Sequence, residues 1–155
     1  MPNVLVSTIR TVGIVYAQSL VQSENRVSIL DCRSEHSKWV QKHSEGLHVL
    51  QVESKRSAFH EHSSLRQFDV AIVFEDDIVE TALIVQSLKE AKIPYVIVVA
   101  EKRPNAAAYR SVGADRVISP DMILNEPMEI CQPSLHVHNQ HQYGSDHLYL
   151  EEAAK

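Results

Sequence analysis

Short apolar runs alternate along the chain with longer segments of helical periodicity. Each run is rich in Val, Ile and Leu and lacks strict alternation with polar residues, which is typical of strands covered on both faces. The pattern predicts six strands, at residues 4–7, 26–30, 47–52, 70–74, 95–99 and 116–118. Strands and helices in alternation indicate βαβ units, and therefore a parallel sheet with helices on both sides.

The segments between the runs predict the crossover helices. Residues 11–23 and 78–91 repeat apolar side chains at helical spacing, so each predicts an amphipathic helix. A shorter helix over residues 105–112 ends at Gly113, a residue type suited to the left-handed C-terminal position. Together these elements predict an α/β fold with a Rossmann-like, doubly wound, parallel six-stranded sheet in a single domain.

The periodicity stops near Pro120. We therefore expect a Rossmann-like domain at residues 1–120 and a C-terminal extension at 121–155, with a short helix over 121–128 and irregular structure beyond it. The extension contains four of the nine histidines, in a spacing that no predicted element fixes, so we expect them to be solvated rather than bound to a metal. They are His136, His138, His141 and His147.

Composition narrows the class of protein. The chain has 155 residues, 44% of them hydrophobic and 23% charged, which is ordinary for one globular domain. A net charge of −5, without any basic run, argues against a nucleic-acid partner. The two cysteines have no metal or redox spacing, which suits a reducing compartment. The N-terminal residues do not resemble a signal peptide, and no apolar run approaches the ~20 residues of a membrane span, so we expect a cytoplasmic location.

The turn after the first predicted strand stands where dinucleotide-binding folds carry G-x-G-x-x-G. Thr8 and Arg10 replace the first two glycines, with Ile9 between them, and Gly13 retains the third. The first glycine permits the tight turn, the second lets the pyrophosphate approach the backbone, and the third lets helix and strand pack closely. We therefore expect Gly13 to keep its packing role. Arg10 either binds a phosphate or fills the cleft.

A second candidate group follows the second predicted strand. Asp31 lies eighteen residues beyond Gly13, where a carboxylate would accept the ribose hydroxyls of an adenine nucleotide. Arg33 could stack on an adenine or contact a phosphate. Asp31 could equally cap a helix that starts near Ser34 or pair with Arg10 across the cleft. Cys32, between the two, could sense oxidants, although no neighbour predicts a lowered thiol pKa.

Three acids, Glu75, Asp76 and Asp77, end the fourth predicted strand, at the edge where ligands bind in open α/β sheets. They could hold a cation or contact an adenosine, and Glu75 is the candidate contact. Acids directly before a helix are also typical of an N-cap, and we favour that interpretation here. Their charges would repel phosphates, which fits an adenosine or a cation better than a triphosphate.

The most specific stretch is "YVIVVAEKRPNAAAYRSVGADRVISPDMI", residues 95–123. It resembles the RCK domains, or regulators of potassium conductance, also called TrkA-N domains, of prokaryotic potassium channels and transporters. Their G-A-D-x-V-I-S-P signature is matched without a gap by Gly113, Ala114, Asp115, Val117, Ile118, Ser119 and Pro120. The resemblance covers about residues 3–123 and implies a Rossmann lobe.

The resemblance also implies a function. Such domains are cytoplasmic, lie at the inner face of the membrane, pair into homodimers or larger rings, and regulate a potassium channel or transporter subunit. Adenine nucleotides (NAD, NADH, AMP, ADP or ATP) would bind at Thr8 to Gly13 and at Asp31. The calcium site of some members would fall on Phe74, Val99 and Glu101, and one carboxylate is too few for calcium. The family's second lobe has no room in this sequence.

Two other classes remain open. A nucleotide-free structural or oligomerisation module would use the same surfaces only for assembly. The loss of two glycines favours that module, whereas Asp31 and Gly13 favour binding. A small NAD-dependent enzyme is the third class, but no nucleophile elbow or ordered triad appears, so we expect no catalytic activity.

Overall fold

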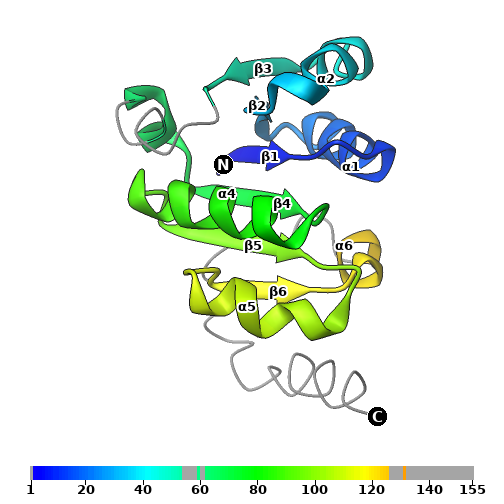
Figure 1. Ribbon diagram of the computed structural model, residues 1–155. Coiled ribbons are helices and arrows are strands. Elements are labelled where there is room, and N and C mark those ends of the chain that lie inside the picture. The colour runs from blue at the N-terminus through cyan, green and yellow to red at the C-terminus, as the bar shows by residue number, and fades with distance from the viewer. Residues whose placement is uncertain (1, 54–58, 60–61, 126–130, 132–155) are drawn as a thin grey trace.

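The computed structural model describes residues 2–53, 59, 62–125 and 131, and Figure 1 shows its elements around one sheet. The strand order is β3-β2-β1-β4-β5-β6, and every neighbouring pair is parallel. This order reverses between β1 and β4, as in doubly wound folds. It confirms the predicted Rossmann-like sheet. The six strands are β1 (Asn3–Ser7), β2 (Arg26–Asp31), β3 (His48–Gln51), β4 (Val70–Phe74), β5 (Tyr95–Val99) and β6 (Arg116–Ile118).

Helices cover both faces of the sheet. The apolar side chains of α1, α2 and α6 belong to the core on one face, and those of α4 and α5 to the core on the other (Figure 1). No helix within the described ranges is long and apolar enough to cross a membrane. The α-helices are α1 (Thr11–Gln22), α2 (Ser37–His43), α4 (Ile78–Glu90), α5 (Ala106–Ser111) and α6 (Pro120–Asn125), and the short 3-10 helices span Ser34–His36, Ser63–Gln67 and Arg103–Asn105.

Side chains alternate between the two cores along the central strands. In β4, Val70, Ile72 and Phe74 face the core under α1, whereas Ala71 and Val73 face the core under α4. None of these five side chains is more than 4% exposed. Full burial of a Val or Ile side chain stabilises the fold by about 1.5–3 kcal/mol. Because both faces are covered, the strand has no polar side, and its sequence is a continuous apolar run.

The signature at residues 113–120 builds the far edge of the sheet. Gly113 has φ +116°, a conformation that residues with a Cβ rarely adopt. Oδ2 of Asp115 accepts hydrogen bonds from the backbone N–H of Val96 at 2.8 Å and from Nζ of Lys89 at 2.9 Å. These contacts tie the turn before β6 to β5 and to the end of α4. The most distinctive motif of the sequence therefore has a structural role.

Asp77 caps α4. Its Oδ1 accepts hydrogen bonds from the backbone N–H groups of Val79 at 2.9 Å and Glu80 at 3.1 Å. A carboxylate in this position satisfies amides that have no partner inside the helix and interacts favourably with the helix dipole. The N-cap interpretation is therefore confirmed for Asp77, while the two acids before it have other partners, described below.

The last described parts of the chain lie on the α1 side of the sheet. Ile123 of α6 is fully buried in that core. Cys131 is also buried there, and its Sγ lies 3.1 Å from the hydroxyl of Tyr16 on α1. The remaining predicted extension, with its four histidines, lies outside the described residues, and the predicted boundary at residue 120 stays a prediction.

Candidate functional site

The turn after β1 packs tightly against the start of α1. Thr8 is buried, and its Oγ1 accepts a hydrogen bond from the backbone N–H of Arg10 at 2.9 Å and donates one to the Arg10 carbonyl at 3.0 Å. A Cβ added to Gly13 would lie 2.2 Å from this Oγ1, far inside contact distance. The helix can approach the turn only because residue 13 has no side chain. Gly13 thus has the packing role that the sequence predicts.

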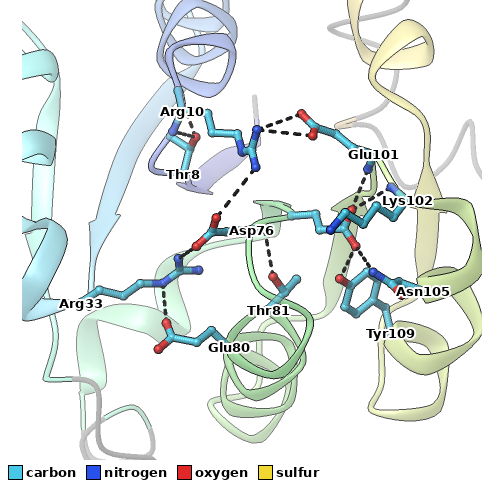
Figure 2. A network of polar contacts seen from close by, with 11 residues as sticks. Thr8, Arg10, Arg33, Asp76, Glu80, Thr81, Glu101, Lys102, Asn105 and Tyr109 are labelled. Carbon is cyan, nitrogen blue, oxygen red and sulfur yellow. Dashed lines mark hydrogen bonds and ion pairs between the residues drawn. The ribbon is translucent and has the colours of Figure 1, made fainter.

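Arg10 occupies the position of the second glycine and is the N-cap residue of α1. Its Nη1 lies 3.4 and 3.5 Å from the two carboxylate oxygens of Glu101, which follows β5 (Figure 2). Its Nη2 lies 3.8 Å from Oδ1 of Asp76, directly beyond β4. These contacts hold the guanidinium over the point between β1 and β4 where dinucleotide-binding folds place their ligand. Each pair is partly exposed, so it stabilises the fold by at most about 1 kcal/mol.

Arg33 extends the same chain of charges. Its side chain is only 7% exposed, with Nη1 3.2 Å from Oδ2 of Asp76 and Nε 3.2 Å from Oε2 of Glu80 on α4. A buried guanidinium without acidic partners would be strongly destabilising, so this arginine depends on both carboxylates. To stack on a base or bind a phosphate, as the sequence predicts, Arg33 would have to exchange one of them.

We call Glu80, Arg33, Asp76, Arg10 and Glu101 the edge network. Acids and arginines alternate along it, and it connects the carboxyl ends of β2, β4 and β5 with the turn after β1 (Figure 2). Three carboxylates against two guanidinium groups leave it with one net negative charge. The site therefore has no surplus positive charge to offer a phosphate chain.

A hollow of ≈180 Å³ adjoins Arg33 and Glu80 on the α4 side of the edge network. Two other hollows, of very different size, are lined by Asp31. The crevice at the turn after β1, which Thr8, Ile9 and Asp31 line, has a volume of ≈10 Å³. A cavity needs roughly 10–15 Å³ to hold one water molecule, so this crevice has room for about one water and not for a phosphate group. A larger cleft of ≈470 Å³, which is in the range of small-molecule sites, begins at the end of β2. Its lining residues are Asp31, Cys32, Arg33, Ser34, Ser37, Gln51, Val52 and Glu53.

Asp31 lines both hollows and is only 5% exposed. Its Oδ2 accepts hydrogen bonds from Ser37 Oγ at 2.7 Å, from Gln41 Nε2 at 3.2 Å and from Gln51 Nε2 at 3.4 Å. Asp31 therefore holds α2 and the end of β3 through side chains, and it forms no ion pair with Arg10. The hydrogen bonds of Asp31 within the described part of the chain all go to Oδ2, so Oδ1 remains available as an acceptor for a ligand.

Glu75 directly follows β4 and lies apart from the cleft, with its side chain against the connection between β5 and α5. Its Oε1 accepts hydrogen bonds from the backbone N–H groups of Glu101 and Lys102, both at 2.9 Å. Its Oε2 accepts them from Asn105 Nδ2 at 2.9 Å and from the Tyr109 hydroxyl. Burial, and then the Glu75 carboxylate, raise the pKa of Tyr109 above its usual range. With four donors Glu75 is fully engaged in the fold, and an adenosine contact would require it to lose one of them.

Cys32 faces the cleft as a thiol. It is 6% exposed, and burial raises its pKa to about 11 despite the opposing effect of the neighbouring Arg33. Thiolate, the reactive form, is therefore scarce at neutral pH, which argues against an oxidant sensor. Among the residues that the structure describes, no three His, Cys, Asp or Glu side chains are grouped so as to hold a metal ion.

Sequence reasoning missed the partners that complete the site. The sequence indicated Glu101 only as the single carboxylate left at a calcium site. It gave no indication of Glu80 or Gln51. Each lies at or just beyond the carboxyl end of a strand, or in the first turn of the following helix. That position was the available signal. The pairing itself requires the strand order, which brings the ends of β1, β4 and β5 together.

Comparison with known proteins identifies the family. The family model of the TrkA-N domain matches residues 4–120. The chain belongs to the TrkA-N domain family. Comparison with curated protein sequences finds no match.

Several solved structures resemble this TrkA-N domain. The TrkA-N domain of the inner membrane protein YbaL from Escherichia coli has a TM-score of 0.58 and 15% identity, over 82% of this chain and 93% of that one. The NAD(P)-binding domain of an exopolyphosphatase-related protein from Archaeoglobus fulgidus has a TM-score of 0.63 and 16% identity, over 86% and 99%. GsuK bound to ADP gives 0.61 and 14%, over 83% of this chain and 34% of that chain. At such identities the likeness shows the fold alone.

Replacement of Gly13 by alanine should destabilise the TrkA-N domain by about 1–3 kcal/mol, because the new Cβ collides with Thr8 and the core must shift. Urea unfolding measures the loss. Alanine in place of Gln18, an exposed residue of the same helix, is the matched control and should change little.

The collision also predicts coupling between the two positions. Replacement of Thr8 by glycine removes the atoms that a Cβ at residue 13 would meet. The double variant should then lose less stability than the sum of the two single variants. Strict additivity of the two losses would show that the contact between Thr8 and Gly13 does not limit packing.

Proposed function

We propose that this TrkA-N domain is a cytoplasmic regulatory domain of the RCK type, serving a membrane potassium channel or transporter, and that an adenine nucleoside or nucleotide is its ligand. One observation supports the ligand above all: the buried Asp31 carboxylate at the end of β2 lines a cleft of ≈470 Å³. In the fold this is the ribose-reading position. Among proteins of the same fold, the GsuK channel has been solved bound to NAD, with a TM-score of 0.60.

The lining of the cleft is chemically suited to a base and a sugar. Cys32 and Val52 supply apolar surface for a flat ring, while Ser34 and Gln51 supply polar groups that can fix its orientation. Oδ1 of Asp31 can accept a hydrogen bond from a ribose hydroxyl without losing any of the bonds to Oδ2.

Asp31 also provides a route from the ligand to the rest of the domain. The same carboxylate holds Ser37 and Gln41 of α2 and Gln51 of β3. A ligand that binds Asp31 changes the strength of those bonds, and therefore the balance between arrangements of α2 and β3. Regulation then requires that a partner contacts these elements differently in the two arrangements.

We also propose that copies of the domain assemble. Val15 on α1, Val79 and Leu83 on α4 and Leu124 on α6 are each more than half exposed. Val79 and Leu83 lie one helical turn apart and form an apolar stripe, which is typical of an interaction surface. A nucleotide-free assembly module would show this stripe but bind no ligand, so the two experiments below separate the alternatives. We propose no catalytic role.

Thermal unfolding against adenosine, AMP, ADP, ATP, NAD and NADH tests the ligand. A ligand that binds only the folded state should raise stability by about 2.7 kcal/mol at a hundredfold excess over its dissociation constant. Asp31→Asn should remove the shift, whereas Asp121→Asn, at an exposed aspartate of α6, should retain it. If no compound shifts the transition at millimolar concentration, the domain is an assembly module.

Sedimentation velocity of the purified chain tests assembly. We expect a dimer or larger species at high micromolar concentration. Leu83→Asp should shift it toward the monomer, because a charge in an apolar interface is desolvated without a partner. Gln18→Asp, at an exposed polar position of α1, is the control and should leave the species unchanged. A wild-type chain that sediments only as a monomer would contradict this part of the proposal.

A further inference from the structure

Only half of a dinucleotide site is open at the carboxyl edge of this sheet. The cleft beyond β2 has a volume of ≈470 Å³, whereas the crevice at the turn after β1 has ≈10 Å³. A dinucleotide needs both, because its pyrophosphate crosses the start of α1 to reach the second nucleoside. The cleft beyond β2 therefore offers space for an adenosine, whereas the crevice at the turn after β1 offers little.

The side chain of Arg10 stands where the pyrophosphate would pass. In dinucleotide-binding folds a glycine at this position lets the phosphates approach the backbone. Here the guanidinium extends across the edge of the sheet and contacts Glu101 at 3.4 Å and Asp76 at 3.8 Å, as Figure 2 shows. Asp76 follows β4 and Glu101 follows β5, whereas Arg10 follows β1. The arginine therefore crosses the place between β1 and β4 where the strand order reverses and where the ligand would pass.

Arg10 is also a poor phosphate ligand in this arrangement. Its charge is already shared between two carboxylates, and Asp76 is in turn bonded to the buried Arg33. A phosphate that displaced Glu101 or Asp76 would bind close to the carboxylate that it released. The resulting repulsion between like charges opposes the exchange.

We propose that Arg10 is the specificity-determining residue of the site. Held by Glu101 and Asp76, it closes the pyrophosphate position, so the domain binds an adenine nucleoside or nucleoside monophosphate and rejects dinucleotides such as NAD. The inference rests on the proposed function of the cleft. The cleft itself is not lined by Arg10, so a nucleoside with at most one phosphate can enter it while the edge network stays intact.

Isothermal titration of the full chain with AMP and with NAD tests the inference by binding alone. The wild-type chain should bind AMP at least tenfold more tightly than NAD. The double variant Arg10→Gly with Glu101→Gln removes one positive and one negative charge together, so the net charge is unchanged while the side chain that extends across the edge of the sheet is lost. It should bind NAD at least tenfold more tightly than the wild type does, and AMP within threefold of the wild-type affinity.

Controls separate this effect from changes in folding or charge. Arg66→Ala removes an exposed arginine from the turn before β4, at the amino ends of the strands, and should leave both affinities unchanged. If glycine at residue 10 lowers the unfolding midpoint, Arg10→Ser with Glu101→Gln takes its place, because serine is a favourable N-cap.

Each outcome has one meaning. Weak NAD binding by the wild type together with a gain in the double variant supports the assignment of Arg10. NAD binding as tight as AMP binding in the wild type, or an unchanged NAD affinity in the double variant, overturns that assignment and leaves the proposed ligand site standing. Absence of binding by both compounds in every variant overturns the proposed ligand site and this inference together.

Discussion

One carboxylate joins the two halves of the sheet at the point where the strand order reverses. Asp76, directly beyond β4, lies 3.2 Å from the buried Arg33 beyond β2 and 3.8 Å from Arg10 in the turn after β1. Dinucleotide-binding folds leave this place open for a ligand. In this TrkA-N domain the charged side chains of Arg10, Asp76 and Arg33 occupy it instead.

The fold was largely predictable because its strands are covered on both faces. The runs at residues 70–74, 95–99 and 116–118 match β4, β5 and β6 residue for residue, since burial on two sides makes these strands largely apolar. The pattern indicated α2 only through a possible start near Ser34, because seven residues are too few to repeat an apolar face. The predicted run at 47–52 extends beyond β3, which is partly exposed and at the edge of the sheet.

The candidate site was predictable in position but not in pairing. The absence of a glycine at residue 10 indicated an altered phosphate position, and Asp31 marked the end of β2 as a candidate ribose site. Whether Arg10 is available to bind a phosphate or is held by a carboxylate depends on Glu101, ninety-one residues away along the chain. No local pattern contains such a partnership, because it arises only when the strand order places the ends of β1 and β5 on either side of β4.

A crystal structure of the chain grown with AMP tests the central claim most directly, namely that the cleft at Asp31 is a ligand site while the edge network keeps the pyrophosphate position closed. The account predicts the ribose beside Asp31, the base between the residues of β2 and β3, and Arg10 still in contact with Glu101. A nucleotide whose phosphate lies at the start of α1, with Arg10 displaced from Glu101, would contradict it.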